Sequence, residues 1–222
     1  MKNKQSFFIR NKKLLFILII IIVIIFLSIF ISKNVIKKQK NGNNMNSQEI
    51  VDNILNLKSY KSKISVQVNS NKNQNKYILT QEYNTENGCI QEVIEPENIA
   101  GVKIIKKDNN LKIENSQLDL KKIYENYSGL EDNSLDLICF INEYKDNPKS
   151  EFEEKNGEII MKTKANKNNL YLKNKALYIN KEKIRPTKLI IQDNNQNSTI
   201  IIEYNEIELN SISTNIQTFK IY

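Results

Sequence analysis

Residues 14–31, LLFILIIIIVIIFLSIFI, constrain this chain more than any other feature. The segment has no charged residue, no Pro and no Gly, and Ser28 is its one polar residue. About 18 residues at a rise of about 1.5 Å make a helix of roughly 27 Å, which is enough to cross the hydrocarbon core of a bilayer. Because lipid offers no backbone hydrogen bonds, such a segment must be helical. The sequence therefore predicts a transmembrane helix from Leu14 to Ile31.

The alternative is a cleaved signal peptide. The apolar core of a signal peptide is usually about 7–15 residues long and is followed by small residues at the cleavage site. Here the run is longer, and no A-x-A pattern follows it. A lipoprotein signal would place a Cys directly after the run, whereas the first Cys in this chain is Cys89. We therefore expect the segment to remain as an anchor.

The order of the segments suggests how the chain is arranged around the membrane. Five basic residues precede the apolar run and four follow it, so the positive-inside rule does not orient it. A short basic N-terminus before a long polar region is typical of a signal anchor. We expect residues 1–13 in the cytoplasm, 14–31 in the membrane, 32–46 as a tether, and 47–222 as one domain outside the cytoplasm.

Net charge gives no indication of nucleic-acid binding. Residues 1–40 hold nine of the 33 basic residues and no acidic one, and the rest of the chain carries 24 basic and 25 acidic residues. The excess positive charge therefore flanks the apolar segment, where it meets anionic headgroups. The following domain has no electrostatic reason to bind a polyanion. We expect the membrane as a partner and no nucleic acid.

Composition also argues against an enzyme. The chain contains no His, which excludes Ser-His-Asp and Cys-His catalysis and His-based zinc sites. The acidic residues within 151–158 surround a hairpin, where strand alternation predicts a solvated edge. The five Gly residues are scattered, so no phosphate-binding loop is present. We expect no catalytic, metal-binding or cofactor-binding residues.

Cys89 and Cys139 are the two cysteines of the chain. Outside the cytoplasm such a pair can form a disulfide. Two buried thiols are the alternative, and the sequence leaves both open.

Two segments have the spacing of helices. Ser47 is the expected N-cap of the first, whose apolar residues recur every three to four positions as far as Leu57. The second is residues 135–144, LDLICFINEY, with an expected cap at Asn133 or Ser134. It is apolar almost all round, so it should be buried on several sides, inside the curve of a sheet.

Most of the remaining domain alternates with period two. Polar turns and Asn156-Gly157 separate the runs, which predicts antiparallel hairpins. The strands are expected within residues 60–70, 76–83, 88–94, 102–106, 111–114, 151–164, 169–174, 176–180, 183–193 and 198–210. About ten or eleven strands and two helices predict an α+β, mainly β fold. This is a half-open curved antiparallel sheet with helices on its concave side, preceded by one N-terminal transmembrane helix.

The order of these elements resembles the LolA-like lipoprotein-carrier superfamily over residues 47–222. The resemblance rests on a first helix ending in LKSYKSKISV, a Q-x-Y strand at Gln81 and Tyr83, an apolar helix in mid-chain and a closing pattern. The closing pattern consists of Pro186, Lys188, Leu189, Ile191 and Asp193, a polar turn, and then Ile202, Tyr204, Ile207 and Asn210.

Within that superfamily the chain is most similar to the clostridial spore-germination protein GerS and its relatives. GerS-like proteins act outside the cytoplasm in spore formation, where they bind a zinc-dependent cortex amidase and support its activity on peptidoglycan. The resemblance implies a non-catalytic partner of a cell-wall amidase, in the space around the forespore, that is needed for later germination. One departure is that GerS resembles a lipoprotein, whereas this chain has Leu14 to Ile31 in place of a lipobox Cys.

The same resemblance leaves a second function open. A LolA-like concave face can hold an acyl chain, and Tyr77, Leu79, Phe140 and Ile141 are the residues expected to line such a cavity. The chain would then be a lipid or lipoprotein carrier or an envelope sensor. The alternative, which we favour, is that the helix at 135–144 fills the hollow and these residues are ordinary core.

The predicted anchor can be tested by fractionation. The full chain should sediment with membranes and stay there after an alkaline carbonate wash, which removes proteins held by charge alone. Protease added outside cells stripped of their wall should digest residues 47–222. A variant without residues 14–31 is the control and should not sediment. Recovery of the full chain in the soluble fraction would contradict the prediction.

Overall fold

The computed structural model describes residues 45–70, 72–127, 134–165 and 171–210. The chain divides into two compact units, Met1–Met45 and Asn46–Tyr222. The predicted transmembrane helix, Leu14 to Ile31, lies outside the described residues. Within the described ranges, no helix has the length and apolar character needed to span a bilayer.

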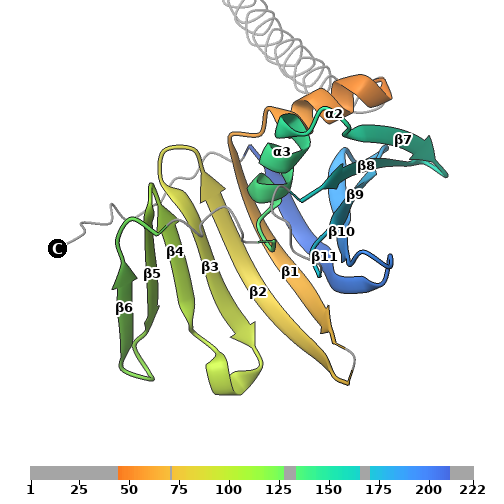
Figure 1. Ribbon diagram of the computed structural model, residues 1–222. Helices are drawn as coiled ribbons and strands as arrows, with labels where there is room; N and C mark the ends of the chain where they lie inside the picture. Colours follow the sequence, from red (N-terminus) through yellow and green to blue (C-terminus); the bar gives the residue numbers. More distant parts are fainter. Residues whose placement is uncertain (1–44, 71, 128–133, 166–170, 211–222) are drawn as a thin grey trace, which may run out of the picture. The chain divides into compact units, whose positions relative to one another are not determined.

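The second unit is built on one antiparallel sheet of eleven strands, together with two α-helices in the described residues (Figure 1). The strands are β1 (Ser59–Asn69), β2 (Gln74–Asn84), β3 (Gly88–Glu95), β4 (Lys103–Lys107), β5 (Asn110–Asn115), β6 (Leu120–Tyr124), β7 (Glu151–Lys155), β8 (Glu158–Lys164), β9 (Asn174–Asn180), β10 (Arg185–Gln192) and β11 (Ser198–Leu209). The helices are α2 (Ser47–Leu55) and α3 (Leu137–Asp146), and a short 3-10 helix spans Glu97–Ile99.

The first and last strands pair at the centre of the sheet. The order is β6-β5-β4-β3-β2-β1-β11-β10-β9-β8-β7, and every pair of neighbours is antiparallel. Two arms therefore extend from the β1–β11 pair, and we call them the β6 arm (β2–β6) and the β7 arm (β7–β10). The strands β6 and β7 are the two edges, and the chain between them contains α3.

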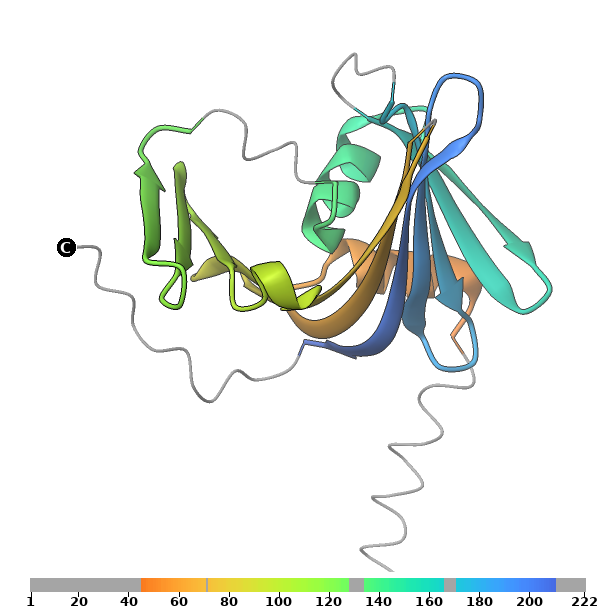
Figure 2. The same ribbon diagram turned by 90° about the horizontal axis from the view of Figure 1, so that it is seen from below.

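The sheet is curved, and α3 lies inside the curve (Figure 2). We call the side that faces α3 the inner face. This arrangement confirms the expected half-open antiparallel sheet with a helix on its concave side. The helix α2 lies beside α3 (Figure 1).

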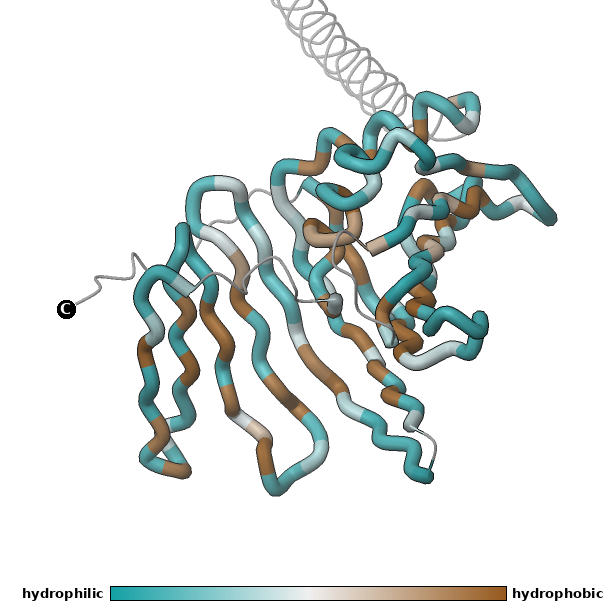
Figure 3. The backbone as a smooth tube through the Cα atoms, viewed as in Figure 1, coloured by the Kyte–Doolittle hydropathy of each residue, from teal (hydrophilic) through white to brown (hydrophobic). Residues whose placement is uncertain are grey.

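Alternation along the strands places the core on the inner face. Hydrophobic and hydrophilic residues alternate along most of them (Figure 3). One register row crosses five strands and is fully or almost fully buried; it consists of Val66, Ile202, Leu189, Leu177 and Met161. Burial of such side chains stabilises the fold by roughly 1.5–3 kcal/mol each, before entropy is counted. The helices complete this core with buried side chains of their own.

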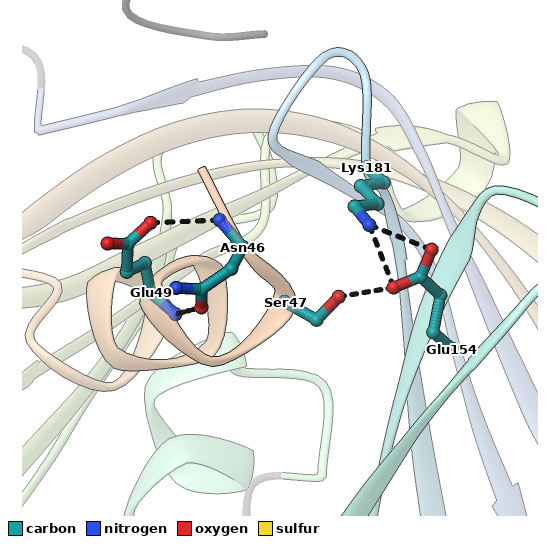
Figure 4. A network of polar contacts seen from close by, with 5 residues as sticks. All are labelled: Asn46, Ser47, Glu49, Glu154 and Lys181. Carbon is teal, nitrogen blue, oxygen red and sulfur yellow. Dashed lines mark hydrogen bonds and ion pairs between the residues drawn. The ribbon is translucent and has the colours of Figure 1, made fainter. Parts of the chain in front are cut away.

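Both helices begin at caps that differ from those expected. Asn46, not Ser47, caps α2. Its side chain accepts a hydrogen bond from the Glu49 N–H at 2.9 Å, and Glu49 Oε2 accepts one from the Asn46 N–H at 2.8 Å (Figure 4). Ser47, released from capping, donates to Glu154 on β7. The cap of α3 is Asp136, so that helix begins two to three residues later than expected.

The strand predictions were largely confirmed, with two differences. Strand β6 was not expected, because its sequence LKKIY shows little alternation. The strand expected over residues 169–174 was wrong at residues 171–173, which do not belong to a strand. Residues 169–170 lie outside the described part of the chain.

Two glycines give a matched test of the packing between β3 and β4. Gly88 has a φ of +80°, and a Cβ placed on it would collide with the Lys106 carbonyl oxygen. Gly157 has a φ of +78°, and a Cβ placed on it would meet nothing within 4 Å. Gly157→Ala should cost about 1 kcal/mol for its backbone conformation. Gly88→Ala should cost at least about 2 kcal/mol, because β4 must also move. Denaturant unfolding measures both, and equal costs would contradict this register.

Candidate functional site

The most distinctive polar structure is a set of charged residues on the inner face, underneath α3. Near the end of the helix, Glu143 Oε2 lies 2.5 Å from the Nζ of Lys175 on β9. The two side chains are 10% and 2% exposed. Thr163 on β8 is buried beside them and donates to the Glu143 carbonyl oxygen at 3.4 Å. This pair joins α3 to the β7 arm.

A second buried group joins the start of α3 to the β6 arm. Asp136 Oδ2 lies 2.8 Å from the Nζ of Lys106 on β4, and the two side chains are 4% and 13% exposed. Its Oδ1 accepts hydrogen bonds from the Gln91 amide on β3 and, at 3.4 Å, from the Cys89 thiol. Because this carboxylate bonds to the sheet, it makes no hydrogen bond to the helix that it precedes.

We call these two ion pairs, Asp136–Lys106 and Glu143–Lys175, the α3 clamp. They attach the two ends of one helix to strands on opposite sides of the central β1–β11 pair. Gln81 on β2 adds a hydrogen bond of 2.9 Å to the Leu135 carbonyl oxygen. The buried charges make the position of α3 specific, because any displacement would leave an uncompensated charge in the core.

Two buried tyrosine hydroxyls lie close to the first half of the clamp. Tyr60 on β1 and Tyr204 on β11 have no hydrogen-bond partner for Oη among the described residues. Burial raises the pKa of Tyr60, and the neighbouring Cys89 and Asp136 raise it further. Burial and Asp136 also raise the pKa of Tyr204 well above its ordinary value. Both phenols therefore stay protonated at neutral pH.

The two cysteines are buried and are not joined by a disulfide, so the structure has the second of the two alternatives left open by the sequence. Cys89 lies on β3 with its thiol directed at Asp136, and Cys139 lies on α3. Burial, followed by the Asp136 carboxylate, raises the pKa of Cys89. Burial raises the pKa of Cys139 to about 11. Neither thiol is therefore activated as a nucleophile.

The residues expected to line an apolar cavity belong mostly to the packed core. Leu79 on β2 is 5% exposed, and Phe140 and Ile141 on α3 are 1% and 0% exposed. Tyr77 lies on β2 two positions before Leu79 and is half-buried. A lipid cavity lined by these four residues stays a prediction.

Sequence reasoning missed the α3 clamp, although a signal for it was present. Lys175 stands in the same alternation phase as Leu177 and Ile179 on β9, which places a lysine on the apolar face. Lys106 and Gln91 likewise occupy inward positions of β4 and β3. A charged residue at an inward-facing position of a strand predicts a buried partner of opposite charge.

No group of three His, Cys, Asp or Glu side chains that could hold a metal occurs in the described ranges.

The family model of the YdcC-like sporulation proteins matches residues 11–216 of this chain. The chain belongs to this family. Because the match covers most of the chain, the membership applies to the sheet domain as a whole. None of the curated proteins matches the chain.

Several solved structures are similar to this chain at low sequence identity. An uncharacterised conserved protein of Thermus thermophilus has a TM-score of 0.50 and 10% identity over 75% of this chain and 89% of its own. The structure of the CwlD amidase of Clostridioides difficile in complex with the GerS lipoprotein also matches. Its TM-score is 0.49 and its identity 21%, over 75% of this chain and 97% of the matching chain. A LolA superfamily protein of Nitrosomonas europaea has a TM-score of 0.40 and 10% identity, over 76% of this chain and 95% of its own.

The clamp predicts an asymmetric response to mutation. Glu143→Gln or Lys175→Met alone should lower the free energy of unfolding by about 3–5 kcal/mol, because each leaves a buried charge without its partner. The double variant Glu143→Leu/Lys175→Met should recover most of that loss. Glu92→Gln, which breaks an exposed pair with Lys103, is the control and should change stability by less than about 1 kcal/mol. Chemical unfolding curves measure all four, and additive losses in the double variant would contradict the clamp.

The thiols can be tested by chemical labelling. With a pKa of about 11, Cys139 is about 0.1% thiolate at pH 8, so a disulfide reagent should not label the native protein. After denaturation without reductant, two thiols per chain should react. Raising the pH towards 11 without unfolding the protein should speed labelling of Cys139. No reactive thiol after unreduced denaturation would mean that the two residues form a disulfide.

Proposed function

We propose that this chain is a non-catalytic, membrane-anchored protein that binds a cell-wall amidase of the spore cortex and supports its activity. The observation that carries the proposal is the match of residues 11–216 to the YdcC-like sporulation proteins. Within that setting, the sequence resemblance to GerS suggests the class of partner. The C. difficile GerS lipoprotein was solved bound to the CwlD amidase, and we extend that class of partner to this chain.

The chemistry of the described residues supports a binding role. The two buried ion pairs hold α3, and the pKa of each buried Tyr and Cys near them is raised, which disfavours the reactive anions. The chain has no His to act as a general base. We therefore propose that catalysis belongs to the partner and that this chain contributes binding and positioning.

The position of α3 indicates where a partner can bind. The helix lies against the inner face, where its residues Leu137, Phe140 and Ile141 are almost completely buried. A protein partner would therefore meet the outer face or the two edges, β6 and β7. Attachment of residues 14–31 to a membrane would keep the complex at the surface where cortex is made, which raises the effective concentration of the two proteins.

The direct test is recovery of the partner from sporulating cells. An affinity-tagged full chain, extracted in mild detergent, should bring down a cell-wall amidase identified by mass spectrometry. The same amidase, purified separately, should then bind the purified full chain. A tagged membrane protein with an unrelated outer domain is the control for nonspecific capture.

Deletion of the gene tests the proposed function in cells. The resemblance to GerS predicts that cortex peptidoglycan from the deletion strain loses muramic lactam and that its spores germinate poorly. Reintroduction of the full chain should restore both. Normal muramic lactam in the deletion strain, together with no amidase in the pull-down, would overturn the proposal.

A further inference from the structure

Edge strand β6 and the residues beside it expose four large apolar side chains. Leu118, Ile123, Tyr124 and Tyr127 are 56%, 43%, 41% and 40% exposed. They are four of the six exposed large hydrophobic side chains among the described residues. The rings of Tyr124 and Tyr127 lie 6.0 Å apart. Large apolar side chains exposed along an edge strand are typical of a strand that can pair with another chain.

The backbone of β6 has one unused side. The strand pairs with β5 from Leu120 to Tyr124 and has no neighbour on its other side in the described sheet. The N–H and C=O groups on that side can therefore pair with a strand from another protein. Main-chain pairing of this kind supplies affinity, and alternating side chains supply specificity.

The charge of β6 indicates the chemistry of the added strand. Lys121 and Lys122 are exposed on opposite faces, and neither forms an ion pair within the described residues. Lys121 pairs in register with Glu114, but Glu114 is engaged by Lys112 at 2.6 Å. An incoming strand with acidic side chains opposite these lysines and an apolar one opposite Ile123 would complement the edge.

The other edge of the sheet lacks these features. On β7, Glu153 pairs with Lys162 at 2.8 Å and Glu154 pairs with Lys181 at 2.8 Å. Ser47 of α2 also donates to Glu154 (Figure 4). None of the exposed large hydrophobic residues of the described chain lies on this strand. Charged edges with internal partners are typical of strands protected against pairing.

A second copy of this chain is a poor occupant of the β6 edge. Antiparallel pairing of two β6 strands over their full length would place Lys122 directly opposite Lys122. Like charges in that position are destabilising. Two of the three glutamates of a second copy's β7, Glu153 and Glu154, are already engaged by Lys162 and Lys181. The charge pattern therefore favours a different protein.

We infer that the free edge of β6 is the surface that binds the amidase partner, by adding an extended strand of the partner that carries apolar and acidic side chains. The inference rests on the proposed function and names the surface through which it operates. The strand would extend the eleven-stranded sheet by one and cover Ile123 and Tyr124.

Binding variants test the surface with the purified amidase as the probe and the full chain in detergent. Ile123→Asp and Lys121→Glu/Lys122→Glu should each weaken binding about tenfold or more, because they place negative charge against an apolar and acidic strand. Glu151→Lys, a charge reversal on the opposite edge strand, is the matched control and should leave the affinity within about twofold. Thermal unfolding of each variant should confirm that the fold is intact.

Hydrogen exchange gives a second readout on the unmodified protein. Amides of residues 120–124 should become protected when the amidase binds, while those of residues 151–155 should not. If the amidase binds but these variants and amides are unaffected, the β6 inference is overturned and the proposed function stands. If the amidase does not bind at all, both the β6 inference and the proposed function are overturned. Self-association of the full chain that Ile123→Asp abolishes, with amidase affinity unchanged, would assign the edge to a second copy and overturn the inference.

Discussion

The α3 clamp is the interaction on which the arrangement of this domain depends. Hydrophobic burial drives the sheet and helices together, but it is non-directional and would tolerate a helix shifted along the inner face. The two ion pairs oppose such a shift, because Lys106 and Lys175 lie on opposite arms of the sheet and each pairs with a different carboxylate on or beside α3. The clamp therefore sets both the position of the helix and the spacing between the arms.

Fixing α3 in this way has a consequence for function. With α3 held against the inner face, the outer face and the two edges of the described sheet remain open to a partner. The two edges of the sheet are unlike each other. On β7, Glu153 and Glu154 pair with lysines of neighbouring segments, whereas β6 exposes apolar side chains and two lysines. The difference between the edges follows from local sequence, EFEEK against LKKIY, and not from the architecture that they share.

The sequence was sufficient to predict the architecture because the periods were clear. Alternation in strands such as β1 and β9 and the Asn156-Gly157 turn indicated an antiparallel sheet, and the all-round apolar character of residues 137–141 indicated a helix inside it. The buried polar groups could not be paired in advance, because Asp136 and Lys106 meet only through the fold. The helix starts were displaced because several residues before each helix can cap it, and Asp136 caps with its backbone while its carboxylate bonds to the sheet.

The pairing of β1 with β11 has a consequence for biosynthesis. These strands are the first and the last of the sheet in sequence, and the Asn210 side chain closes their junction by accepting from the Lys58 N–H at 3.0 Å. A ribosome makes β1 long before β11, so the middle of the sheet stays incomplete until β11 has been translated. The nascent chain thus carries a half-built core with two open strand edges during elongation, and the domain can close only after β11 has been made.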